Sequence, residues 1–304
     1  MLVTACLSAT FGAALLAQSV VRTADPIKRG LKESDFPRTI KVTENVYTYE
    51  DFHAGDEKFT TTNMFVVTDE GVFVADGQGS PPETKGLVDA IAKVTPKPIK
   101  YVAICSDHGD HTAGNASFPP DVRYVIHATS KAILDRSANG WKPPQDRTDV
   151  ITDRKMMTLG GEMIGISFIG RSHTGGDLVV WLPKQKILFL SEIFLNRVFP
   201  AMRSAYPSEW LKALDVAEQI NADIYIAGHG FTETGPVSKE ELRAYHKAME
   251  AVIAEATRLH KAGVPVEDAI KQANFGEYAS WTLSKSQGPI AIRKVYEELE
   301  RKLK

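Results

Sequence analysis

The segment 104–115, ICSDHGDHTAGN, limits what this chain can be more than any other part of the sequence. It follows the apolar run from Ile99 to Cys105, which is typical of a buried strand, and it contains His108, Asp110 and His111. Binding and catalytic side chains are often placed on the loops that follow strands. Histidine and carboxylate side chains this close together can supply the nitrogen and oxygen ligands of a zinc ion. Taken alone, the segment is equally consistent with a solvated polar turn.

Three later segments support the metal interpretation, because each places one potential ligand at the end of a predicted strand. They are His173 in GRSHTGGD, Glu192 in FLSEIF and His229 in AGHGF. The sequence has only two cysteines, Cys6 and Cys105, which excludes a four-thiolate zinc site and makes a disulfide framework unlikely to be the basis of the fold. A metal site in this chain must therefore be built from histidine and carboxylate side chains.

The remaining pattern alternates strands with helices. Two β-rich runs lie between Thr39 and Gly77, and a hairpin signal at 69–71 breaks the second. The polar stretch between the runs, from Asp51 to Thr62, is predicted to be a loop that could fold over a site. Further predicted elements are helices at 82–94, 128–137 and 208–220, strands at 99–105, 122–127, 164–169, 178–182, 187–190 and 224–227, and a polar loop reaching about residue 150. This alternation predicts a layered α/β domain over residues 39–236.

The last part of the sequence, residues 237–304, has a different character. A long helical pattern runs from Ser238 to Ala262, and Ser238 and Glu241 have the spacing of a capping box. Further helical stretches continue to the end, so we predict a C-terminal helical extension. It either packs on the α/β domain or associates with a second copy to form a homo-oligomer.

Composition and charge narrow the class of partner. The 304 residues include 36 basic and 38 acidic side chains, a formal net charge of −2, which argues against nucleic-acid binding. Hydrophobic residues make up 43% and charged residues 24%, as expected of a soluble globular protein. No feature of the composition points to a nucleic-acid partner, and we expect a small-molecule substrate.

Residues 1–21 contain no charged side chain, and the small residues Ala17 and Ser19 precede Arg22, as in a cleaved secretory signal peptide. No basic residue precedes the apolar stretch, so a misassigned start or an uncleaved membrane anchor are the alternatives. A signal peptide predicts a periplasmic or secreted protein with no stable membrane association after cleavage. Its removal would leave Cys105 as the one cysteine, unable to form an internal disulfide.

The order and spacing of these segments resemble the metallo-β-lactamase superfamily. That family has the pattern H-x-H-x-D-H after a strand, then a lone histidine in a G-H-T-x-G turn, then G-D, then G-H. The resemblance runs from about Val42 to Phe231 and includes Asp76 in VADGQG, which matches an early strand-end aspartate of the family. It implies an αβ/βα sandwich with a metal site at one edge of two facing sheets.

Two positions depart from the family pattern. Ser106 stands where the family has its first histidine, and Glu192 stands where it has the aspartate that bridges two metals. The resemblance then implies a first metal group with His108 and His173 but without its third imidazole. Because a serine hydroxyl is a poor zinc ligand, we predict that this group is weak or empty. Glu192 could still reach a metal, hydrogen-bond a ligand or turn away, and the sequence does not choose among these.

The second group of the family pattern is complete here. It consists of Asp110, His111 and His229, which leave an open fourth position as in a catalytic zinc site. We therefore predict one tightly bound Zn²⁺. Zinc lowers the pKa of a bound water from near 16 to about 7, which makes hydroxide available at neutral pH.

The predicted function is a zinc-dependent hydrolase in which a metal-bound hydroxide cleaves an ester, lactone, amide (including a β-lactam) or thioester. Asp110 would orient the nucleophile, and His108 or His173 could act as general base if the first group is empty. One alternative is a binding module of the same fold whose site has decayed at Ser106 and Glu192. Another is an iron-dependent member, since histidine and carboxylate ligands also suit iron.

Several conspicuous residues are not expected to hold a metal. His127, His246 and His260 are interpreted as satisfied or solvent-facing histidines, and Cys105 as a core residue. For His53 a contact with substrate stays open, because it belongs to the predicted loop. Arg203 and Tyr206 are candidates for lining the substrate pocket, because they follow the Glu192 segment.

Overall fold

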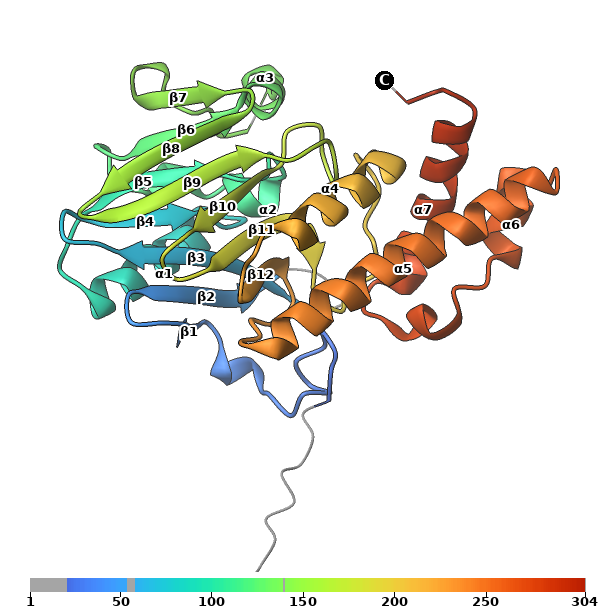
Figure 1. The fold of residues 1–304 in the computed structure, drawn as a ribbon, viewed down its shortest axis with the longest axis horizontal. Helices are drawn as coiled ribbons and strands as arrows, with labels where there is room; N and C mark the ends of the chain where they lie inside the picture. Colours follow the sequence, from blue (N-terminus) through green and yellow to red (C-terminus); the bar gives the residue numbers. More distant parts are fainter. Residues whose placement is uncertain (1–20, 54–57, 139, 304) are drawn as a thin grey trace, which may run out of the picture.

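The computed structural model describes residues 21–53, 58–138 and 140–303, which form stacked sheet and helix layers with a helical segment at one end (Figure 1). The strands are β1 (Arg38–Lys41), β2 (Val46–Phe52), β3 (Thr60–Val67), β4 (Val72–Ala75), β5 (Ile99–Ile104), β6 (Arg123–His127), β7 (Thr148–Ile151), β8 (Arg154–Leu159), β9 (Glu162–Phe168), β10 (Leu178–Leu182), β11 (Ile187–Leu195) and β12 (Ile224–His229). The helices are α1 (Pro81–Val94), α2 (Gly109–Thr112), α3 (Ala128–Arg136), α4 (Pro207–Gln219), α5 (Pro236–Lys261), α6 (Val266–Gln272) and α7 (Ser284–Leu299).

The predicted signal peptide falls almost wholly on residues 1–20, outside the part of the chain that the structure describes. In the described part, no helix combines the length and the apolar character needed to cross a membrane.

The strands form two halves that meet at one point. In one half the order is β7-β6-β5-β4-β3, with β2 and β1 beyond β3, and in the other it is β12-β11-β10-β9-β8. β3 and β12 pair antiparallel through Thr61 and His229. The metal-ligand candidate His229 thus lies at the junction of the two halves.

Apolar side chains divide the molecule into layers. Between the two halves lies a fully buried layer that includes Met64, Phe73, Val125, Ile166, Leu178, Phe189 and Ile226. On the outer side of the first half, side chains of α1 such as Leu87 and Ile91 pack on β4 and β5. On the outer side of the second half, α4 and α5 cover β11 and β12. This order of layers confirms the predicted αβ/βα sandwich.

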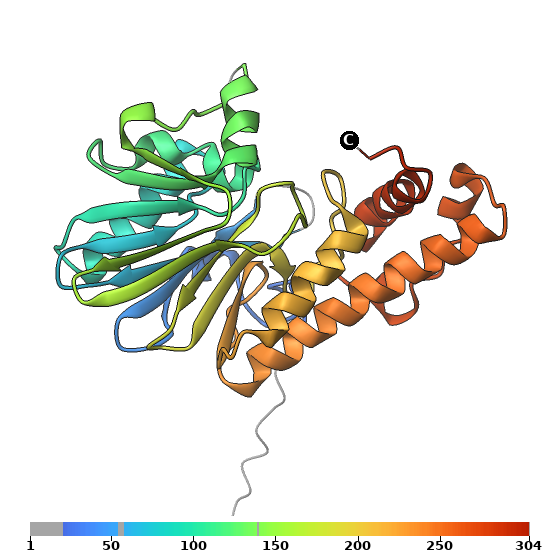
Figure 2. The same ribbon diagram turned by 45° about the horizontal axis from the view of Figure 1, so that its top comes forward.

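The C-terminal helices extend from the outer side of the second half (Figures 1 and 2). α5 buries Leu242, Tyr245, Met249 and Val252 on one face, and α7 packs against α5 and α6. The helical extension is therefore confirmed as a structure, and it packs on the sandwich through α4 and α5.

The predicted capping box at Ser238 and Glu241 is wrong. α5 begins earlier, with Pro236 at its first turn. The Ser238 hydroxyl instead accepts a hydrogen bond from the Tyr225 backbone N–H at 3.1 Å, and Glu241 forms an ion pair with Arg197. Both side chains that suggested a cap are used for tertiary contacts.

Two predicted loops are also partly wrong. The polar stretch from Asp51 to Thr62 ends in strand, since β3 begins at Thr60, and the polar loop before Val150 leads into β7. β8 was missed, and its side chains are exposed or half-buried along most of its length. Threonine-rich and half-exposed strands give a weak apolar alternation, which explains all three errors.

Candidate metal centre

Short local structures bring the candidate ligands to the edge where the two halves meet. After β5 the chain turns into the single-turn helix α2, with His108 at its N-cap position and Asp110 and His111 within it. His229 is the last residue of β12, and His173 lies in the loop between β9 and β10. The structure thus gathers all the predicted ligands at one end of the sandwich.

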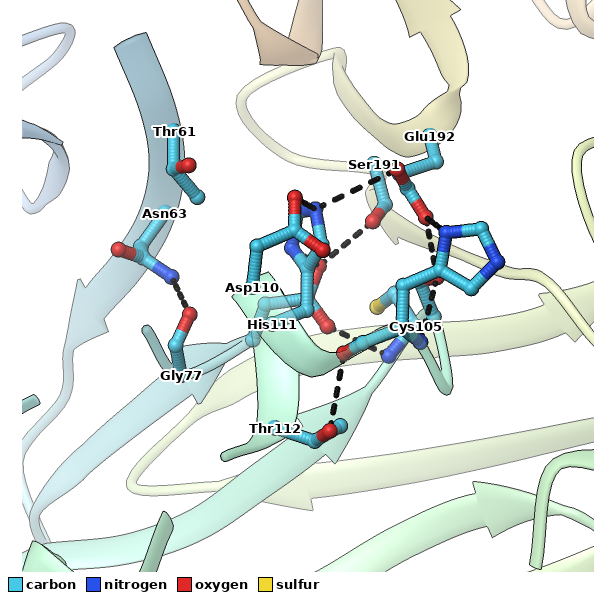
Figure 3. Close-up of polar contacts among 12 residues, drawn as sticks. Thr61, Asn63, Gly77, Cys105, Asp110, His111, Thr112, Ser191 and Glu192 are labelled. Carbon is cyan, nitrogen blue, oxygen red and sulfur yellow. Dashed lines mark hydrogen bonds and ion pairs between the residues drawn. The ribbon is translucent and has the colours of Figure 1, made fainter. Parts of the chain in front are cut away.

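Glu192 is aimed into this edge by an irregularity in β11. The pairing of β11 with β12 shifts register on both sides of Ser191, whose φ of 47° lies in the left-handed region. Such bulges re-aim the following side chain. The Glu192 side chain is 4% exposed and turned toward Asp110 and His111 (Figure 3). Of the alternatives left open for Glu192, the structure excludes that it turns away.

One group of side chains consists of Asp110, His111, Glu192 and His229. His229 Nε2 lies 3.1 Å from Asp110 Oδ2, 3.4 Å from Glu192 Oε1 and 3.3 Å from His111 Nε2. His111 Nε2 lies 3.7 Å from Asp110 Oδ2. Two imidazole nitrogens and two carboxylate oxygens therefore converge on one point.

The other group consists of His108, His173 and Glu192. Glu192 lies 3.1 Å from His173 Nε2 through Oε1 and 3.1 Å from His108 Nδ1 through Oε2. The Ser106 hydroxyl donates a hydrogen bond to Glu192 Oε2. Glu192 thus places a carboxylate beside His108 and His173, and Ser106 holds that carboxylate. The sequence left open whether Glu192 reaches a metal, and the structure places it in both groups.

The electrostatics of the two groups favour a cation. Burial opposes a charge on His229, but hydrogen bonds to Asp110 and Glu192 raise its pKa to about 10. Burial likewise opposes a charge on His108, whose pKa the neighbouring Glu192 carboxylate raises to about 10. Burial raises the pKa of Glu192, but the adjacent His173 and His108 bring it well below its usual range. The site thus stabilises positive charge between its carboxylates.

These donor sets fit a divalent metal such as zinc. Zinc takes imidazole nitrogen and carboxylate oxygen, and the group of Asp110, His111, Glu192 and His229 offers two of each. Catalytic zinc sites combine three protein ligands with a water and can expand to five-coordinate, so this set also leaves room for a water. The facing nitrogens of His111 and His229 need a shared proton or a cation between them. Iron accepts the same ligands, so the donor set fits the class of metal and leaves its identity to experiment.

Buried contacts to the Nδ1 atoms of His229 and His111 orient these imidazoles. The Nδ1 atom of His229 lies 3.1 Å from the Thr60 carbonyl oxygen, which fixes Nδ1 as the protonated nitrogen and leaves Nε2 free for a metal. His111 Nδ1 lies 3.3 Å from Asp76 Oδ2. Asp76 itself accepts hydrogen bonds from the Cys105 backbone N–H at 2.7 Å and the Ser191 hydroxyl at 2.6 Å. Asp76 therefore ties His111 to the segments that carry Cys105 and Glu192.

We expect Asp76→Asn to lower zinc affinity by about 10- to 100-fold, as other contacts behind metal-binding histidines do. The amide loses the charge that orients His111 while keeping its size. The matched control is Glu50→Gln, another fully buried carboxylate, which contacts Arg38 and Thr232 instead of the metal groups. Zinc titration by calorimetry and chemical unfolding of both variants provide the measurement. Equal zinc affinities in the two variants would contradict this role of Asp76.

A cavity of about 440 Å³ opens onto the two groups. Its walls include His53, Phe59, His108, Asp110, His173, Glu192, Leu195, Val198, Ala201, Arg203, Ser204, His229, Leu283 and Gln287. This volume is within the usual range for a small-molecule site. Arg203 was expected to line a pocket, whereas no local sequence signal pointed to Leu283 and Gln287, which come from the C-terminal extension.

The structure also places the histidines that were not expected to be ligands. His53 Nδ1 lies 3.6 Å from Asp110 Oδ2, and burial, as the main cause, lowers the His53 pKa to about 4. His53 lines the cavity, so it can contact a bound molecule. The others lie outside both groups: His127 accepts the Thr129 N–H at the start of α3, His246 contacts Glu218, and His260 contacts Tyr296.

Comparisons with known proteins give one consistent result. The family model of the metallo-beta-lactamase superfamily matches residues 58–229. The chain is 28% identical over 155 residues to metallo-beta-lactamase IND-1 of Chryseobacterium indologenes, which covers 51% of this chain and 63% of that protein. It is 22% identical over 196 residues to metallo-beta-lactamase type 2 of Bacillus cereus, covering 62% and 75%. The match to IND-1 thus spans less than two thirds of that protein.

Solved structures show the same fold. A metallo-beta-lactamase from Pontibacter korlensis superposes with a TM-score of 0.61 at 20% identity, covering 69% of this chain and 98% of that one. The sec-alkylsulfatase Pisa1 from Pseudomonas sp. superposes with a TM-score of 0.68 at 14% identity, covering 86% of this chain and 50% of that one.

Proposed function

Because the chain belongs to the metallo-β-lactamase superfamily of metal-dependent hydrolases, we propose that it is a zinc-dependent hydrolase that cleaves an ester, lactone, amide or thioester. The observation that carries this proposal is the convergence of the two ligand groups on Glu192 at the wall of a substrate-sized cavity. A chain that had lost its chemistry would have no need for buried carboxylates facing buried imidazoles, since such a cluster is costly to bury without a cation.

Bound at these groups, zinc would supply Lewis-acid activation of the substrate and a water that ionises near neutral pH. Asp110 is suited to orient that nucleophile, because its carboxylate is 21% exposed, lines the cavity and is held by His229. His108 and His173 also line the cavity. With a metal in one group only, these two imidazoles take up or deliver the proton; with metals in both groups, they are ligands.

Metal removal tests the proposal directly. We expect the purified, dialysed protein to retain about one zinc per chain, to lose hydrolysis of a neutral ester or lactone after chelation, and to recover it when zinc is returned. Elemental analysis and a panel of ester, thioester, lactone and β-lactam substrates provide the measurement. Hydrolysis that survives complete metal removal would contradict the proposal, and failure to bind any metal would favour the binding module.

A further inference from the structure

One wall of the cavity joins the sandwich to the C-terminal extension. The segment between β11 and α4, residues 196–206, contacts the start of α7, since Val198 forms a β-bridge with Thr282 and the Phe199 N–H donates to the Thr282 carbonyl at 2.8 Å. Leu283 and Gln287, which follow, line the same cavity as the metal groups. The extension therefore contributes directly to the site. α7 lies beside α4 and α5 at this end of the molecule (Figure 2).

This wall is apolar, whereas the metal groups are polar. Leu195, Val198, Ala201 and Leu283 line it, and Phe199 and Met202 anchor the same segment in the core. The wall is built on buried side chains, so it is fixed in position. An aliphatic surface in the same cavity as a charged cluster suits a ligand that has an alkyl portion.

Arg203 adds a positive charge to the rim of this wall. It is exposed and lines the cavity, and the next residue, Ser204, lies 3.4 Å through Oγ from His108 Nε2. Neighbouring arginines are neutralised, because Arg197 pairs with Glu241 and Arg171 with Glu209. In the described part of the chain, Arg203 has no such carboxylate partner. The two carboxylates that line the cavity, Asp110 and Glu192, already contact imidazoles.

We propose that this wall binds an amphiphilic anion: a carboxylate or sulfate group pairs with Arg203, and an alkyl portion packs on Leu195, Val198 and Leu283. The inference deepens the proposed function, on which it rests, by naming the substrate class as an anionic molecule with an aliphatic part. A guanidinium pairs with either anion through two parallel N–H groups. The C-terminal extension then helps to select the substrate.

The test compares binding of octanoate, octyl sulfate and neutral octanol to the zinc-loaded protein by calorimetry. We expect Arg203→Gln to raise the Kd of the two anions by roughly 5- to 10-fold and to leave octanol unchanged. Coordination of an anion by the metal is common to both proteins, so the difference isolates Arg203. The matched control is Arg154→Gln, an exposed arginine on β8 away from the cavity, which should bind all three probes like the wild type.

A second variant tests the apolar part. Leu283 has a φ of 69°, a conformation that asparagine tolerates, so Leu283→Asn removes the aliphatic surface with little backbone strain. It should weaken binding of all three probes. Unchanged anion binding in Arg203→Gln overturns the charged half of the proposal, and unchanged octanol binding in Leu283→Asn overturns the apolar half. A response confined to octanoate or to octyl sulfate identifies the anion as a carboxylate or a sulfate.

The same preparations separate this inference from the proposed function. Wild-type hydrolysis of a neutral ester, and its loss on chelation, reports on the metal groups alone. If the wild type binds the anions through Arg203 but hydrolyses none of the substrates in the panel, the wall stands as an anion-binding site and the hydrolase proposal fails. If the wild type hydrolyses esters while Arg203→Gln binds the anions as tightly as the wild type, the hydrolase proposal stands and the anion-binding role of Arg203 fails.

Discussion

Replacing Asp110 with Asn is expected to lower kcat/KM by about 10²- to 10⁴-fold, because the carboxylate that orients the nucleophile is lost. Asp110 Oδ2 lies 3.1 Å from His229 Nε2 and 3.7 Å from His111 Nε2, so its charge contributes to the metal group as well as to the orientation of the nucleophile. The surrounding cationic imidazoles, His111 foremost, outweigh its burial and hold its pKa below the usual range. Asn keeps the shape of the side chain and removes this charge.

The decrease should appear mainly in kcat, because the nucleophile is affected more than the cavity walls. The matched control is Asp135→Asn on α3, an exposed carboxylate that pairs with Lys131. Steady-state kinetics of both variants, with thermal unfolding to confirm folding, provide the measurement. A rate for Asp110→Asn within a few-fold of the control would contradict the assigned role of Asp110.

Much of the metal centre could be predicted from the sequence because it is locally encoded. His108, Asp110 and His111 follow one strand within one short segment, and the strand pattern itself predicts where they lie. His229 is likewise the last residue of a strand. Candidate ligands that lie at the end of a strand can be recognised because the apolar run of that strand precedes them in the sequence.

The features that the sequence did not predict depend on contacts between distant segments. Glu192 reaches both groups because a bulge at Ser191 changes its direction, and no apolar pattern encodes that bulge. Leu283 and Gln287 reach the cavity because Thr282 pairs with the segment around Val198. A distant contact also explains the wrong capping-box prediction at Ser238, because its hydroxyl accepts a hydrogen bond from the Tyr225 backbone N–H.

Ser106 is a single residue whose contacts with a distant segment could not be predicted from the local sequence. From its chemistry alone, a serine in place of a histidine predicts a weakened first group. In the structure its hydroxyl donates to Glu192 and accepts the His108 N–H at 3.3 Å. Ser106 therefore holds the carboxylate that both candidate metal groups share. That the group with His108 and His173 binds metal weakly or not at all stays a prediction, which metal analysis tests.

Replacing Glu192 with Gln is expected to weaken zinc binding in both groups by about 10-fold or more, because a neutral amide replaces the one carboxylate that they share. His173→Ala is the matched comparison, since His173 belongs only to the group with His108. In a zinc titration of chelator-treated protein, we expect the wild type to show a tight step and a weaker one. His173→Ala should lose only the weaker step, and Glu192→Gln should weaken both. Calorimetry gives each affinity, and elemental analysis after dialysis gives the zinc retained. If Glu192→Gln leaves the tight step unchanged, Glu192 serves one group only, and the tight site consists of Asp110, His111 and His229.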